Sequence, residues 1–113
     1  MRPAGKTTIA NDVLLSTARL TTLDVEGVSR MGSPSGSVKR LMRGGEMEEG
    51  VRLEMVDDKV NLDIFVVLFN DVNVRQVSRN IQESVARAVS KSVGVEIGRI
   101  NIHIADIDYG PKD

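Results

Sequence analysis

The chain carries a single histidine, His103, and two carboxylates follow it closely, at Asp106 and Asp108. A histidine near carboxylates can bind a metal ion or serve as a general base. In a regular strand, however, side chains alternate between the two faces, so His103 would point away from both aspartates. A polar strand face near a solvated chain end is the simpler interpretation. We therefore predict neither a catalytic residue nor a metal ligand here.

Other signatures of catalysis or cofactor binding are missing from the sequence. There is no cysteine, which excludes disulfides, zinc thiolate sites and a thiol nucleophile. There is no Gly-x-x-x-x-Gly-Lys or Gly-x-Gly-x-x-Gly, and no Gly-x-x-Gly of the kind that clamps a nucleic-acid backbone in KH domains. Asp57 and Asp58 could hold a cation, but a tight turn explains them through hydrogen bonds to the backbone. We predict no cofactor.

Four basic residues are predicted to lie on the outer side of one helix, around Glu83: Arg75, Arg79, Arg87 and Lys91. Such a face can bind an acidic protein, anionic lipid head groups or nucleic acid, and it can equally be an ordinary solvated helix face. The whole chain is nearly neutral, with 15 basic and 16 acidic residues. No global field therefore favours nucleic acid.

The length of 113 residues predicts one domain, residues 1–113, with a single small core. The first residues lack the apolar stretch of a secretion signal, and no run approaches the ~18 apolar residues of a membrane span. The sequence therefore predicts a cytoplasmic protein without a span of its own. With only two phenylalanines and one tyrosine, the core must consist mainly of aliphatic side chains.

The first half of the chain is predicted to contain a short strand at 5–9 and a helix that is capped by Asn11 or Asp12 and extends to about Asp24. Gly27 is a natural stop after this helix. Residues of about 29–50 hold five of the ten glycines and are predicted to form a flexible Gly/Ser-rich loop.

The second half of the chain is predicted to form a hairpin, a helix and a last strand. The hairpin strands are 51–56 and 60–69, and the helix at 74–93 begins with Asn73 as its cap. In the last strand Ile100, Ile102 and Ile104 share one face, and Gly98 is a candidate bulge. The fold class is therefore α+β: a small, mostly antiparallel sheet with two helices packed on one face, in the order β-α-β-β-α-β.

The strand 60–69 begins with alternating apolar and polar residues and becomes apolar on both faces from Ile64. One face is predicted to meet the helices, with Val60, Leu62, Ile64, Val66 and Leu68. The other face would carry Phe65, Val67 and Phe69, beside His103 and Ala105. This second face is predicted to be a contact surface for a partner. The alternative is that the loop 29–50 folds over it and uses it internally.

The sequence resembles the bacterial alkaline shock protein family, also called the envelope stress response family. The resemblance rests on four blocks in order: Gly5-Lys6-Thr7-Thr8-Ile9-Ala10 with Val25-Glu26-Gly27-Val28; Gly50-Val51 with Val60-Asn61-Leu62-Asp63-Ile64; Val77-Ser78-Arg79-Asn80-Ile81-Gln82-Glu83-Ser84-Val85; and Ile100-Asn101-Ile102-His103-Ile104-Ala105-Asp106-Ile107. The resemblance implies a small cytoplasmic α+β domain without enzymatic activity that takes part in cell-envelope homeostasis and stress. It also implies self-association and attachment to the inner face of the membrane through a membrane-anchored partner.

From the residues and this resemblance together, we predict a non-enzymatic protein that forms homo-oligomers and docks to a membrane-anchored protein. The predicted interaction residues are Phe65, Val67, Phe69, His103, Arg75, Arg79, Arg87 and Lys91. The alternative function is a small nucleic-acid-binding module that uses the basic helix face.

Overall fold

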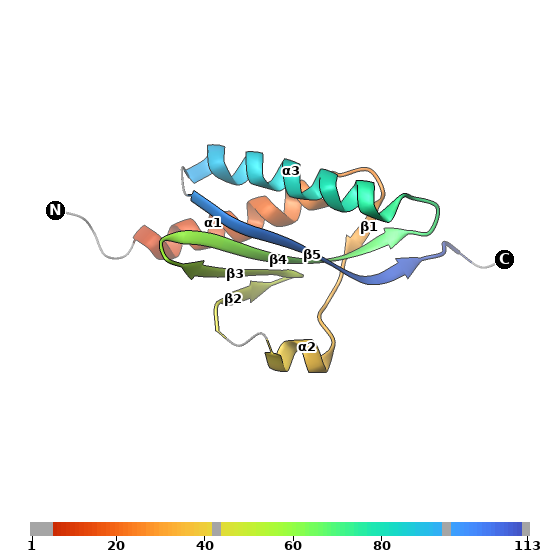
Figure 1. Ribbon diagram of the computed structural model, residues 1–113, viewed down its shortest axis with the longest axis horizontal. Coiled ribbons are helices and arrows are strands. Elements are labelled where there is room, and N and C mark those ends of the chain that lie inside the picture. The colour runs from red at the N-terminus through yellow and green to blue at the C-terminus, as the bar shows by residue number, and fades with distance from the viewer. Residues whose placement is uncertain (1–5, 42–43, 94–95, 112–113) are drawn as a thin grey trace.

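The structure is a computed structural model that describes residues 6–41, 44–93 and 96–111. Within these ranges the chain forms three helices and five strands (Figure 1). Their order and bounds are α1 (Lys6–Leu23), β1 (Val28–Met31), α2 (Gly36–Leu41), β2 (Glu46–Glu48), β3 (Val51–Val56), β4 (Lys59–Phe69), α3 (Val74–Val93) and β5 (Glu96–Asp108).

Strand β4 lies at the centre of the sheet. Along one edge it pairs antiparallel with β3 through its first half and with β1 through its second half. Along the other edge it pairs parallel with β5 over its whole length. Strand β2 continues the sheet beyond β3. The long helices α1 and α3 cover one face, which we call the inner face, and the short α2 lies on the opposite, outer side (Figure 1). The predicted α+β class with both main helices on one face is confirmed.

The hairpin between β3 and β4 follows from its turn residues. Asp57 and Asp58 have φ angles of 52° and 66°, the left-handed conformation that a two-residue hairpin turn requires and that aspartate tolerates. The turn pairs Val56 with Lys59 and thereby fixes the whole register. The second helix also begins as predicted, because the backbone N–H of Gln76 donates to Asn73 Oδ1 at 3.0 Å.

The core lies between the inner face and the two long helices. All five residues predicted for this face of β4 have an exposed fraction of 0%: Val60, Leu62, Ile64, Val66 and Leu68. Helix α3 adds a stripe at helical spacing, Val77, Ile81, Val85 and Val89. Burying one such side chain stabilises the fold by about 1.5–3 kcal/mol. Because the apolar faces of sheet and helices match, this layer is the main source of stability.

The beginning of the chain differs from the prediction. Residues 6–10 belong to α1 rather than to a strand at 5–9, and Asn11 and Asp12 lie inside the helix instead of capping it. The β-branched residues there favour a strand only weakly, whereas each added helical residue extends a helix that is already packed on α3. Leu15 of α1 is buried, with 4% exposed.

The stretch predicted as a loop at 29–50 contains three short elements, β1, α2 and β2. The loop prediction was wrong for these residues because strands of three or four residues have no periodicity of their own. Their ladder with β4 or β3 stabilises them instead. After β1, Gly32 donates its backbone N–H to the Phe65 carbonyl at 2.7 Å, which draws the chain across the outer face.

Two bulges shape β5. The predicted one lies at Gly98 and Arg99, where Asn61 Oδ1 accepts the backbone N–H of Arg99 at 2.8 Å. The other lies at Ala105, because Val66 pairs with Ile104 whereas Val67 pairs with Asp106. This extra residue reverses the alternation of side chains along β5. Asp106 therefore lies on the same face as His103, whereas a regular strand was predicted to place it on the opposite face.

The contact between Gly32 and the bulge at Ala105 generates a stability prediction. A Cβ added at Gly32 would lie 2.6 Å from the Cβ of Ala105, which is too close for two carbons. Gly32→Ala should therefore destabilise the protein by about 1–3 kcal/mol in urea unfolding. The double variant Gly32→Ala with Ala105→Gly should recover most of this loss. A double variant no more stable than Gly32→Ala alone would show that the contact is not responsible.

Candidate functional site on the outer face of the sheet

The outer face carries a polar group that the strand register brings together. Arg52 of β3 lies opposite Asp63 of β4, and Asp63 lies opposite Asn101 of β5. Two residues further along, Phe65 lies opposite His103. Paired residues project to the same face, so all five side chains point away from α1 and α3. We call these five residues the outer-face cluster.

Asp63 is the centre of the outer-face cluster. Its Oδ2 accepts a hydrogen bond from Arg52 Nη1 at 3.1 Å. Its Oδ1 lies 2.9 Å from His103 Nε2 and accepts from Asn101 Nδ2 at 3.2 Å. Only 7% of Asp63 and 6% of Arg52 is exposed. A buried carboxylate needs several donors to replace its hydration, and this one has three.

The pKa of Asp63 is lowered below its ordinary value of 3.8. Burial by itself raises the pKa of this carboxyl group, because removal from water disfavours the charged form. The hydrogen bonds from His103 and Asn101, the attraction of His103 and the hydrogen bond from Arg52 oppose that effect and together exceed it. Asp63 is therefore ionised at neutral pH and forms a short-range ion pair with Arg52.

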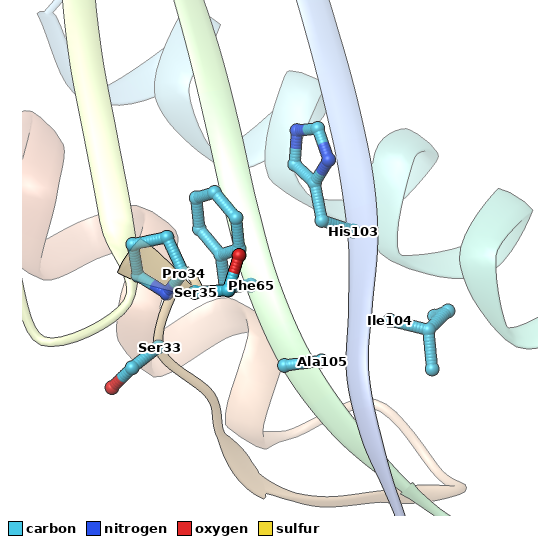
Figure 2. Close-up of a pocket in the computed structure, with 7 residues that line it drawn as sticks. All are labelled: Ser33, Pro34, Ser35, Phe65, His103, Ile104 and Ala105. Atoms are coloured by element: carbon cyan, nitrogen blue, oxygen red, sulfur yellow. The ribbon is translucent and has the colours of Figure 1, made fainter. Parts of the chain in front are cut away.

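The two rings of the cluster are stacked. The centroids of Phe65 and His103 lie 4.5 Å apart, with 15° between the ring planes. The segment Ser33–Ser35 passes on the other side of Phe65, and a shallow cavity of about 410 Å³ lies between this segment and β5. Figure 2 shows Pro34 and Ser35 against Phe65, while the Ile104 side chain points away from His103, on the other side of β5.

The structure decides between the two arrangements predicted for the second apolar face of β4. Phe65 and Val67 are each only 3% exposed, because β1 pairs with β4 and carries the following segment over them. The prediction of an open contact surface is wrong for these two residues. Phe69, at the end of β4, is 43% exposed. Its role as a contact residue stays a prediction.

The basic residues lie in the other layer of the molecule. Arg75, Arg79, Arg87 and Lys91 are exposed on α3, and none of them forms an ion pair within the described ranges. Helix α3 covers the inner face (Figure 1), whereas the paired residues Phe65 and His103 point from the outer face. The predicted interaction residues therefore belong to two separate surfaces.

The remaining acidic residues of β5 have structural partners. Asp108 accepts from Ser29 Oγ at 2.6 Å and from the backbone N–H of Gly110 at 2.8 Å, and it lies 3.6 Å from Arg30. The Ser29 and Gly110 hydrogen bonds lower the pKa of Asp108, with a smaller contribution from Arg30. Asp106 Oδ1 accepts the backbone N–H of Ile107 at 2.8 Å.

Sequence reasoning did not identify Arg52, Asp63 and Asn101 as a group. The two-residue turn at Asp57 and Asp58 was a usable signal, because it fixes the hairpin register and so places Arg52 directly opposite Asp63. The contact of Asp63 with His103 had no such signal, since it depends on a parallel pairing between residues 40 positions apart.

The chemistry available to the cluster is limited by its own bonds. His103 Nε2 is engaged with Asp63, and no hydroxyl group of a described residue bonds to the imidazole. No group of three or more metal-ligating side chains occurs in the described part of the chain. None of the described helices is both long and apolar enough to cross a membrane.

A family model for the alkaline shock protein 23 family, which has a cell envelope-related function, matches residues 2–109. The chain belongs to this family. The match covers all eight helices and strands described above, and it confirms the resemblance seen in the sequence.

Several known proteins and solved structures are similar to this chain. The uncharacterized protein YqhY of Bacillus subtilis (strain 168) is 28% identical over 110 residues, which cover 96% of this chain and 81% of the relative. The uncharacterized protein Spy1535 of Streptococcus pyogenes serotype M6 is 33% identical over 104 residues, 91% of this chain and 79% of the relative. A MamM CTD variant has a TM-score of 0.55 at 15% identity, covering 94% of this chain and all of that one. This last likeness concerns the fold alone.

The lowered pKa of Asp63 predicts how stability depends on pH. A carboxyl group whose pKa is lower in the folded state stabilises the protein above its unfolded pKa, and this contribution is lost as the pH falls through the folded value. Asp63→Asn should cost up to about 3–5 kcal/mol at neutral pH, because buried Arg52 loses its ion pair with Asp63 and keeps the more exposed one with Glu54. The difference from the unsubstituted protein should shrink as the pH falls below 3.8.

Urea unfolding of both proteins across the acidic range measures this difference. Asp12→Asn is the matched control, since Asp12 is exposed on α1, and it should leave stability nearly unchanged at every pH. A difference between Asp63→Asn and the unsubstituted protein that stays constant below 3.8 would contradict the assigned role.

Proposed function

We propose that this protein is a non-enzymatic component of cell-envelope homeostasis that acts by self-association and by docking to a membrane-anchored protein partner. The observation that carries the proposal is the open sheet. Among the described residues, β5 pairs only with β4, and β2 pairs only with β3, so both ends of the sheet have an unpaired edge. Unpaired strand edges readily accept another chain. The cell envelope-related function of the family supports a role at the cell envelope.

The outer-face cluster supports a structural role for its polar residues. Its charged side chains are used to neutralise one another: Arg52 pairs with Asp63, and Asp63 also bonds His103. Phe65 covers the imidazole ring from one side. A histidine and a carboxylate held in this way fix the position of β5 against β4. We therefore assign the outer-face cluster to positioning the β5 edge.

Docking to a partner is supported by the exposed cations of α3. All four residues are exposed, and α3 lies on the side of the sheet opposite α2 (Figure 1). A membrane-anchored protein with an acidic segment facing the cell interior would complement this charge. In this proposal the chain works at the inner face of the membrane because its partner holds it there.

Self-association should be visible in solution. Light scattering from the full chain should give a mass that exceeds the 12.3 kDa of one copy and rises with concentration. Phe65→Glu is not a suitable probe, because Phe65 is buried and the change would destabilise the fold. A mass of one copy at every concentration would refute this part of the proposal.

Docking can be tested with membranes rather than whole lysates. The purified chain should co-sediment with inside-out membrane vesicles from the cells that produce it. Vesicles shaved with a protease, and liposomes made from the extracted lipids, should retain much less, because the proposed receptor is a protein. Equal binding to the protein-free liposomes would assign the attachment to lipid and contradict the proposal, as would no binding to any vesicle.

A further inference from the structure

The β5 edge carries positive charge on its helical side. Gln82 of α3 donates from Nε2 to the Ile100 carbonyl of β5 at 2.9 Å, so this flank of α3 lies over β5. Arg75 and Arg79 precede Gln82 by seven and three residues, which places all three side chains on the same flank. Both arginines are exposed and form no ion pair with any described residue. They therefore stand above the open edge of β5.

The β2 edge carries negative charge on the same side of the sheet. Glu46 lies opposite Leu53 and Glu48 opposite Val51, and both of these partners are core residues of the inner face. The two glutamates must therefore project toward the helical side as well. Asn11 of α1 donates to Glu46 Oε2 at 3.3 Å, which agrees with this direction. Both glutamates are exposed.

The two edges also run in compatible directions. Strand β2 is antiparallel to β3, and β3 is antiparallel to β4, which is parallel to β5. Strands β2 and β5 therefore point the same way. A second copy placed beside the first, with its helices on the same side, would bring its β2 parallel to β5 and extend the sheet.

We propose that copies of this chain associate through β2 of one copy and β5 of the next, with Glu46 and Glu48 facing Arg75 and Arg79 of the neighbour. The inference rests on the self-association proposed above and names its surfaces. Two symmetric contacts would also keep the helices of both copies on the same side of the sheet. A contact between two β5 edges would bring the arginines of both copies together, and a contact between two β2 edges would bring the glutamates together. Repulsion between like charges disfavours both, so charge favours the pairing of β2 with β5. A contact between two different edges leaves one of each free, so further copies can add until a ring closes or a filament extends.

Charge reversal on each edge tests the pairing. Sedimentation velocity of the full chain at low salt should show that E46K/E48K and R75E/R79E each weaken self-association by more than about tenfold. An equimolar mixture of the two variants should restore it in an alternating chain. At one contact the lysines of one variant meet the new glutamates of the other, and at the next contact native glutamates meet native arginines. Far-UV circular dichroism should confirm that these surface variants are folded.

The matched control is R87E/K91E, which changes the charge of α3 by the same amount on the flank away from Gln82. It should associate like the unsubstituted chain. The inference is overturned if the unsubstituted chain associates and the edge variants do so equally well, if their mixture fails to restore association, or if R87E/K91E weakens it as much as R75E/R79E does. A chain that never associates refutes the self-association itself, so the two failures can be told apart.

Discussion

Strand β4 is buried on both faces and paired along both edges, and the other elements are arranged by that constraint. Its inner residues reach an exposed fraction of 0% beneath α1 and α3, which is the usual two-layer solution. Its outer residues Asp63, Phe65 and Val67 are nearly as buried, although no long helix lies over them. The second face is instead covered by β5 side chains and by the segment that follows β1. Strand β1 and the segment that follows it therefore make the burial of the central strand possible.

Covering that second face required a buried carboxylate, which costs free energy unless it is fully paired. Asp63 meets this requirement with donors from two strands, Arg52 on one side and Asn101 with His103 on the other. An apolar group of the same shape could be equally stable, so the ion pair by itself is weak evidence of stabilisation. Its more specific effect is on register. A one-residue slip of β5 would turn His103 away from Asp63 and Phe65, and leave a charge buried with fewer donors.

The parts that could be predicted are those encoded by local pattern. The hairpin at 51–69, the cap at Asn73 and the inner face of β4 each depend on residues close in sequence, and each was confirmed. The hairpin turn is one residue shorter than the predicted 57–59, because Lys59 already pairs with Val56. What failed depended on distant partners. Strand β1 has four residues and no periodicity, so only its ladder with β4 defines it. The bulge at Ala105 reversed the faces of Asp106 and Asp108, and no local turn residue marks it.

The same constraint explains why the edges, rather than the faces, remain available for other molecules. Once helices cover the inner face and the cluster covers the outer one, unpaired backbone groups remain along the strand edges, among them those of β5 and β2. Edges of this kind are usually protected by bulges, charges or short strands. Here β5 has two bulges and a carbonyl capped by Gln82, and β2 has only three residues with two glutamates. These charges protect each edge against the same edge of another copy, because like charges repel. They do not protect the β2 edge against the β5 edge of another copy, because those two edges carry charges of opposite sign.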